Sequence, residues 1–145
     1  MAVFASQVKI DGKPLSEMGL SPERWAEIKQ ITTQGGSRII KLRGRSSFQS
    51  PSYLSVEMIR SVMGGAPFAY PAGTYVKNEK YQNIMMAMDT TLDQNGCSYK
   101  VPTGTAEEVA ALDASYAHLC KMRDELVTLN IVPPVAEWNK INPNL

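Results

Sequence analysis

The spacing of apolar residues changes along the chain, and each change predicts a new element. Residues 2–10 (AVFASQVKI) alternate roughly between apolar and polar positions, which is typical of a strand. Asp11-Gly12 follows, and both residues tolerate the positive φ that a two-residue hairpin turn requires. We therefore predict a strand and a short hairpin arm that ends near Leu15.

Helical spacing begins at Ser21. A serine before Pro22 is typical of a helix start, because the hydroxyl caps a free N–H and proline needs none at the first helical position. Trp25, Ile28 and Ile31 then form one apolar face. Although Gly35-Gly36 weakens the helix, the apolar pattern resumes at residue 39, so we predict a helix over about 21–42.

A second helix is predicted from about Ser50 to Met63. Leu54, Met58 and Val62 recur every four residues, and Ser50-Pro51 repeats the combination of a capping serine and a proline. Glycines at 64 and 65 follow, as is common where helices end.

The middle of the chain predicts three strands, over 68–76, 83–92 and 97–101. Pro71 places the first strand at a sheet edge or a bulge, because proline has no N–H to donate to a neighbour. In the second strand, Ile84, Met86 and Met88 occupy alternate positions that share one face. Asn95-Gly96 favours a tight hairpin turn into the third strand.

The last predicted helix is the longest. Thr105 and Glu108 have the spacing of a capping box. A stripe at intervals of three and four residues follows, which we interpret as a core face: Val109, Leu112, Tyr116, Leu119, Arg123 and Leu126. We expect the proline-rich tail to lie extended, held by Trp138.

Together these elements predict one α+β domain over residues 1–145. Its order is an N-terminal hairpin, two helices, an antiparallel three-stranded meander and a long C-terminal helix. A parallel sheet is not predicted, because strands and helices do not alternate regularly.

Composition narrows the functional classes. The net charge of +1 argues against a nucleic-acid partner, and no apolar run approaches the roughly 20 residues that cross a membrane. The first residues lack the pattern of a secretory signal, and Cys97 and Cys120 lack the spacing of a metal site. We expect a cytoplasmic protein with two reduced, partly buried thiols and no metal.

The stretch IIKLRGRSSFQSPS (39–52) has the most suggestive chemistry. Lys41, Arg43 and Arg45 lie within five positions, and serines follow. One interpretation is that hydroxyl and N–H groups at a helix start surround an anion. The other is that the serines only cap the helix while the basic side chains are solvated. The spacing leaves both interpretations open, because no glycine-rich phosphate loop is present.

No complete catalytic set is visible elsewhere. His118 is the single histidine, and its place on the long helix indicates a surface or boundary residue. Asp89 lies on a predicted strand, but no neighbouring residue supports a catalytic role for it. The acidic residues of the long helix are interpreted as solvated charges and dipole partners. From spacing alone we assign no catalytic residue.

Four stretches carry a resemblance to a known family: IIKLRGRSSFQSPS, PFAYPAGTYV, NIMMAMDTTLDQNGCSYK and TAEEVAALDASYAHLCKMRDE. They resemble the carboxy-terminal half of malate and lactate dehydrogenases, and the tail PPVAEWNKINPNL is similar to bacterial malate dehydrogenases. The resemblance implies the C-terminal substrate domain of an NAD-dependent enzyme. The N-terminal Rossmann domain that binds NAD is absent from this chain, as are the family's catalytic histidine and paired arginines, which lie upstream.

The resemblance also implies roles for three residues. Ser47, and next to it Ser46, match positions that approach the 2-hydroxy or 2-oxo dicarboxylate substrate, and Pro51 matches a position near the nicotinamide of NAD. Arg43 and Arg45 match no catalytic arginine. The implied parent is a homo-oligomeric malate or lactate dehydrogenase. This chain, taken alone, is expected to be inactive. The alternative is a free-standing interaction module that keeps the fold without the chemistry. The resemblance does not decide whether the substrate is malate or another 2-hydroxy acid.

Overall fold

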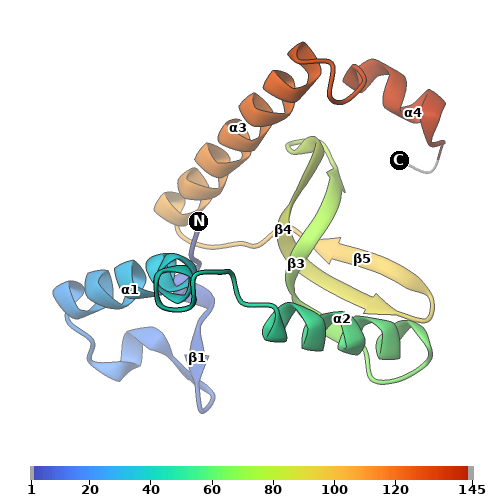
Figure 1. Ribbon diagram of the computed structural model, residues 1–145. Helices are drawn as coiled ribbons and strands as arrows, with labels where there is room; N and C mark the ends of the chain where they lie inside the picture. The colour runs from blue at the N-terminus through green and yellow to red at the C-terminus, as the bar shows by residue number, and fades with distance from the viewer. Residues whose placement is uncertain (1, 144–145) are drawn as a thin grey trace. The chain divides into compact units, whose positions relative to one another are not determined.

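The computed structural model describes residues 2–143. The chain divides into two units, which are described separately. One comprises mainly Val3–Phe68 and Leu92–Cys97, and the other mainly Ala69–Thr91 and the residues from Ser98 onward. Figure 1 shows the elements, which mix helices with antiparallel strands, so the predicted α+β class is confirmed.

The chain begins with a small hairpin between short 3-10 helices. Strands β1 (Lys9–Ile10) and β2 (Lys13–Pro14) pair antiparallel, and 3-10 turns cover Ala5–Gln7 and Leu15–Met18. Asp11 and Gly12 have φ of 51° and 80°, so the predicted two-residue turn is confirmed. The long strand predicted over 2–10 is wrong. Local i to i−3 hydrogen bonds form there instead, from the N–H of Gln7 to the carbonyl of Phe4 and from the N–H of Val8 to that of Ala5.

Helix α1 spans Pro22–Arg43, close to its predicted bounds. The Ser21 hydroxyl accepts a hydrogen bond from the backbone N–H of Arg24 at 3.2 Å, as the cap predicted. The helix passes through Gly35-Gly36 without a break and ends at Gly44, whose φ of 67° suits glycine.

Helix α2 spans Gln49–Val62 and is joined to the following strands through Ser61. The buried Ser61 hydroxyl donates to the carbonyl of Leu92 and accepts from the N–H of Phe68 at 3.0 Å. Only glycine fits at position 65, just past the end of α2, because a Cβ there would lie 2.8 Å from the carbonyl oxygen of Arg60. The predicted glycine stop is therefore confirmed.

Strands β3 (Phe68–Lys77), β4 (Gln82–Asp93) and β5 (Gly96–Lys100) form a meander in that order. β3 is an edge strand, which accommodates Pro71 as predicted. Alternate residues of β4 are buried, and these include the predicted trio. The buried apolar residues among those described are Phe68, Val76, Tyr81, Ile84, Met86, Met88 and Leu112.

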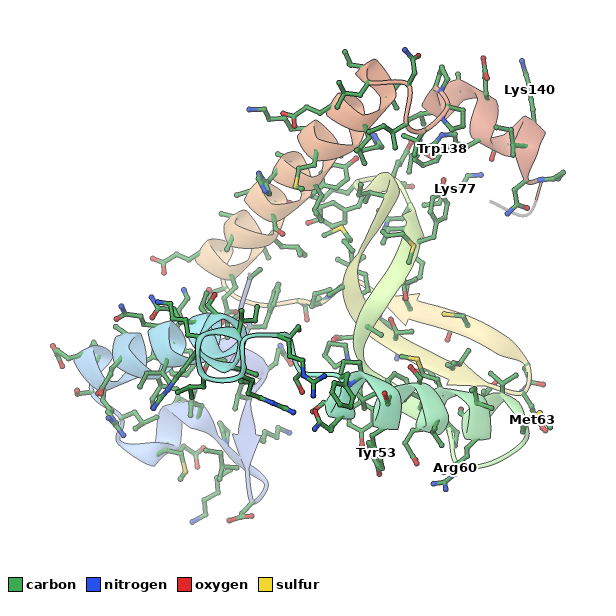
Figure 2. The ribbon with its side chains drawn as sticks, viewed as in Figure 1. Tyr53, Arg60, Met63, Lys77, Trp138 and Lys140 are labelled. Atoms are coloured by element: carbon green, nitrogen blue, oxygen red, sulfur yellow. The ribbon has the colours of Figure 1, made fainter. Side chains whose placement is uncertain are left out.

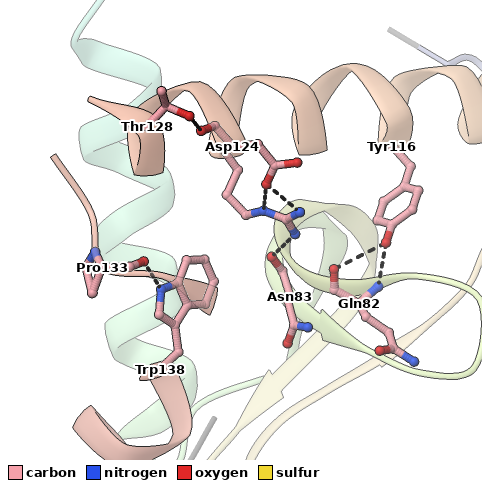
Figure 3. A network of polar contacts seen from close by, with 8 residues as sticks. Gln82, Asn83, Tyr116, Asp124, Thr128, Pro133 and Trp138 are labelled. Atoms are coloured by element: carbon pink, nitrogen blue, oxygen red, sulfur yellow. Dashed lines mark hydrogen bonds and ion pairs between the residues drawn. The ribbon is translucent and has the colours of Figure 1, made fainter. Parts of the chain in front are cut away.

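Helix α3 (Ala106–Thr128) starts with the predicted capping box and packs by its side chains against the β3–β4 turn. The Tyr116 hydroxyl accepts from the N–H of Gln82 at 3.2 Å and donates to its carbonyl at 3.3 Å (Figure 3). Arg123 Nη1 donates to the carbonyl of Asn83 at 3.0 Å. Of the predicted stripe, Leu112 is buried and Leu126 is exposed, so the core face is confirmed only in part.

The tail differs from its prediction. It is not extended: a 3-10 turn at Val135–Glu137 leads into the short helix α4, Trp138–Ile141. Trp138 does hold the segment, because its Nε1 donates to the carbonyl of Pro133 at 2.8 Å (Figure 3).

Both cysteines are free thiols. Cys120 is half-buried, but Cys97 is exposed rather than partly buried as expected. Across residues 2–143, we found no helix whose length and apolar character would let it cross a membrane.

Candidate functional site

The candidate site is the serine segment, defined here as residues 44–51, which joins α1 to α2. It begins where Gly44 ends α1, with its N–H donating to the carbonyl of Ile40 at 2.8 Å. It closes with the first turn of α2. A loop between two helix ends leaves side chains and N–H groups available to a ligand.

Phe48 orients Arg45 of this segment and Arg43 at the end of α1. The guanidinium carbons of Arg43 and Arg45 lie 5.8 Å and 4.9 Å from the centre of the Phe48 ring, within the range of a cation–π contact. Arg43 also donates from Nη1 to Oε1 of Gln49 at 3.0 Å. Both arginines are therefore directed toward the start of α2.

The start of α2 corrects one prediction. The helix begins at Gln49, so the N-cap is Phe48, which makes no side-chain cap hydrogen bond. Ser50 lies inside the first turn and is not the cap. The hydroxyl of Ser52 instead donates back to the carbonyl of Phe48 at 2.7 Å. No side chain caps this helix, which weakens the interpretation that the serines serve only as caps.

The structure places the three predicted site residues within six positions of the chain. Ser47 is half-buried, and its hydroxyl lies 3.4 Å from Oε1 of Gln49. Ser46 is exposed in the loop, and Pro51 is exposed on the first turn of α2. Their roles toward substrate and cofactor remain predictions.

Two acidic side chains of the unit that contains the serine segment are paired with arginines outside the segment. Glu27 pairs with Arg24 at 2.6 Å, and Glu57 pairs with Arg60 at 2.7 Å. Neither Arg43 nor Arg45 has an ion-pair partner within this unit. The segment therefore presents positive charge without an internal counter-ion.

Phe48 and Gln49 are the residues that sequence reasoning missed. The signal was available, because an aromatic residue three positions after one arginine and five after another lies within reach of both once a helix ends between them. The spacing of the serines and the glycine does not by itself predict that the arginines stack on Phe48.

The other candidates considered from the sequence do not gather into a site. His118 is exposed on α3. Asp89 is exposed and borders a shallow hollow of about 190 Å³ near Pro71 and Lys100. Within residues 2–143, no group of three or more histidine, cysteine or acidic side chains is placed to hold a metal ion.

One polar cluster with shifted pKa values lies at the β3–β4 turn. Hydrogen bonds from Lys80 and then Tyr81 lower the pKa of Asp113. Burial, followed by the bond to Asp113, raises the pKa of Tyr81. All three groups are satisfied by one another, so we interpret the cluster as structural.

Comparisons with known proteins connect this fold to one group of enzymes. No family model matches the sequence. Among curated relatives, the malate dehydrogenase of Nitratiruptor sp. is 27% identical over 88 residues, which is 60% of this chain and 27% of the relative. The malate dehydrogenase of Shouchella clausii is 29% identical over 107 residues, which is 72% of this chain and 34% of the relative.

Comparison with solved structures also finds malate and lactate dehydrogenases. Malate dehydrogenase from Plasmodium falciparum in complex with NADH matches with a TM-score of 0.78 and 22% identity, covering 86% of this chain and 43% of that one. The malate dehydrogenase of Salinibacter ruber matches with a TM-score of 0.78 and 22% identity, covering 87% and 42%. A minor L-lactate dehydrogenase from Enterococcus mundtii reaches 0.71 at 14% identity, covering 88% and 41%.

The fold is therefore that of a part of the malate and lactate dehydrogenases. Within that class, the sequence is similar to malate dehydrogenases, so the resemblance seen in the four stretches is confirmed. The chain spans about a third of the length of the curated relatives it matches. This coverage is consistent with the C-terminal domain that the resemblance implied.

Proposed function

We propose that the chain is the substrate-side domain of an NAD-dependent malate dehydrogenase. The observation that carries the proposal is the match to malate dehydrogenases in both sequence and fold, over most of this chain but well under half of theirs. Such a domain supplies one wall of the active site, and a Rossmann domain supplies the other. The cytoplasm, where such thiols stay reduced, is the proposed compartment.

In this proposal the chain binds and orients the substrate. Ser47 is half-buried, and its hydroxyl is held by Gln49, so its position is defined before substrate arrives. Ser46, exposed beside it, offers a second hydroxyl. Ser46 donates a hydrogen bond to one end of a 2-hydroxy or 2-oxo dicarboxylate, and Ser47 does so by exchanging its bond to Gln49 for one to the substrate. The proton-accepting histidine and its supporting groups belong to the part of the enzyme outside this chain.

The chain fits only a small part of an NAD site. Pro51 presents an exposed apolar ring on the first turn of α2, which suits contact with the planar nicotinamide. The chain contains no glycine-rich phosphate loop, so the other cofactor contacts lie elsewhere. When bound, NAD accepts hydride from the carbon that carries the hydroxyl.

The test begins with the coding sequence upstream of this chain. We expect the reading frame to continue through a Rossmann domain, and the longer protein to oxidise NADH when oxaloacetate is supplied. The 145-residue chain alone should show no turnover, because it lacks a phosphate loop and a histidine near the serine segment. Turnover by the chain alone, or a longer protein without activity, contradicts the proposal. A start site without an upstream Rossmann domain favours the interaction module.

Ser47→Leu in the longer protein tests the site itself. The larger side chain should crowd the substrate, lowering kcat/KM for oxaloacetate at least tenfold, which corresponds to about 1.4 kcal/mol of transition-state stabilisation. NADH affinity and Tm should change little, since Ser47 lies in a loop. Ser37→Leu, at an exposed position of α1, is the matched control and should leave kcat/KM unchanged. A lower Tm with normal kinetics means that Ser47 is only structural.

A further inference from the structure

The turn between β4 and β5 exposes an asparagine that is followed by a glycine. Gln94 and Asn95 form the turn, and Gly96 begins β5. The backbone N–H of Asn95 donates to Oδ1 of Asp93 at 2.7 Å. Among residues 2–143, no group forms a hydrogen bond with the Asn95 carboxamide. The side chain of Asn95 is therefore free to rotate while its backbone is held.

Gly96 places an unshielded backbone nitrogen beside that carboxamide. Gly96 is exposed, and a Cβ built there would meet no atom within 4 Å beyond its neighbours in the chain. Its φ of 119° lies in the region that favours glycine, so the local backbone itself calls for a residue without a side chain. A ring can thus close between the Gly96 nitrogen and the side-chain carbon of Asn95.

We propose that Asn95 is a modification site at which the chain deamidates spontaneously. The Gly96 nitrogen attacks the side-chain carbonyl carbon of Asn95 and forms a C–N bond. The bond from that carbon to Nδ2 breaks, and ammonia leaves with the proton that the Gly96 nitrogen carried. Water then opens the resulting cyclic imide at either carbonyl, which yields aspartate or isoaspartate. The reaction consumes only water, and the inference is independent of the proposed function.

Two asparagines near the β3–β4 turn are held by hydrogen bonds that Asn95 lacks. Oδ1 of Asn78 accepts from the backbone N–H groups of Lys80 and Tyr81, both at 2.9 Å. Oδ1 of Asn83 accepts from the Tyr75 hydroxyl at 2.9 Å. Because these bonds fix the carboxamides, we expect both residues to react more slowly than Asn95.

The remaining described asparagines have a less accessible nitrogen after them. Asn130 precedes Ile131, whose branched side chain shields the backbone nitrogen. Asn139 lies within the short helix α4, which restrains its backbone. Asn142 precedes Pro143, and proline has no N–H to lose. The chain therefore contains its own internal controls.

The modification changes a turn that adjoins the end of α2. Oε1 of Gln94 lies 3.4 Å from the position that a Cβ at Gly64 would occupy, and the carbonyl of Leu92 accepts from the Ser61 hydroxyl. Either product adds a negative charge close to Asp93, and like charges repel. Isoaspartate also lengthens the main chain, so we expect the joint between the hairpin and α2 to loosen.

The test is to age the purified 145-residue chain in neutral buffer made with heavy-oxygen water, and to map the incorporated oxygen by peptide mass spectrometry. We expect position 95 to gain label about tenfold faster than any other asparagine, a difference of about 1.4 kcal/mol in activation free energy. Asn95→Gln should abolish the acidic form that isoelectric focusing detects after ageing. Asn139→Gln, at an exposed position of α4, is the matched control and should leave that form unchanged.

A synthetic peptide of residues 92–98 sets the time scale of the experiment. Three results would overturn the inference: no label at position 95 when the peptide is fully labelled, label spread evenly over the asparagines, or an undiminished acidic form in Asn95→Gln. The activity of the longer protein decides the proposed function and has no bearing on these results.

Discussion

Asp113 of α3 shows how single side chains fasten an element. Its Oδ1 lies 2.7 Å from Nζ of Lys80 and accepts from the Tyr81 hydroxyl at 2.6 Å. The Tyr81 ring meets Tyr116 edge-on, with centroids 5.1 Å apart. The β3–β4 turn is therefore held on α3 by charge, hydrogen bonding and ring packing at once.

Tyr81→Phe separates these contributions. The ring, only 1% exposed, and its contact with Tyr116 should survive, while the hydrogen bond to Asp113 is lost. We expect the free energy of unfolding to fall by about 1 kcal/mol. Urea denaturation measures it. Tyr53→Phe, which alters a 63% exposed tyrosine of α2, should have no measurable effect, and an equal effect of the two variants would contradict the assignment.

The same cluster predicts a pH dependence. The pKa of Asp113 is lowered from 3.8 on folding, so its ionised form stabilises the fold above that pH, and this contribution is lost as the pH falls through the lower, folded-state pKa. The pKa values of Lys80 and Tyr81 are raised, so their contributions persist at neutral pH and are lost as the pH rises above about 10.

Asp113→Asn should therefore flatten the loss of stability below about pH 4. Denaturation curves at several pH values measure the slope. Asp89→Asn, at an exposed position of β4, is the matched control and should keep the wild-type slope. If both variants keep that slope, Asp113 does not contribute to the acid dependence.

At the scale of elements, the alternation along β4 decides which methionines stabilise the sheet. Met88 is 1% exposed, whereas Met85, on the opposite face of the same strand, is 58% exposed. Met88→Ala should leave a cavity and lower the free energy of unfolding by about 2–5 kcal/mol. Met85→Ala should cost far less. Thermal denaturation of both variants gives the comparison, and equal losses would mean that the buried face is assigned wrongly.

The sequence predicted the elements whose signals are local. The caps at Ser21 and Thr105, the Asp11-Gly12 turn and the alternation in β4 each depend on neighbouring residues, and all are confirmed. Bounds of α1, α2 and the three strands fall within one or two residues of their predictions.

The predictions that were wrong lie where competing local hydrogen bonds determine the backbone conformation. The 3-10 turn at Ala5–Gln7 replaces a strand because its alternation was weak and its residues form i to i−3 bonds. The tail folds back through the bond from Trp138 to Pro133, which spacing alone does not reveal. In the candidate site, the serines were identifiable but the orientation of Arg45 by Phe48 was not, because stacking depends on side-chain geometry.

At the scale of the whole molecule, helices α1 and α2 leave many large apolar side chains exposed. Leu42 of α1 is 77% exposed. Met63, which lies just past α2 and is labelled in Figure 2, is 81% exposed. The other large exposed apolar residues of α1 and α2 are Ile31, Ile39, Ile40, Tyr53, Leu54, Val56, Ile59 and Val62.

Such surface predicts that the chain self-associates when its proposed partner domain is absent, because apolar groups leave water when a partner covers them. Light scattering over a wide concentration range should show a mass that rises with concentration. Ile59→Lys places a charge on the exposed side of α2 and should shift the chain toward the monomer, whereas Ser55→Lys, at an exposed polar position of the same helix, should not. A monomer at every concentration would mean that the exposed apolar residues of α1 and α2 do not drive association. Association that persists in Ile59→Lys would mean that Ile59 does not lie in the contact.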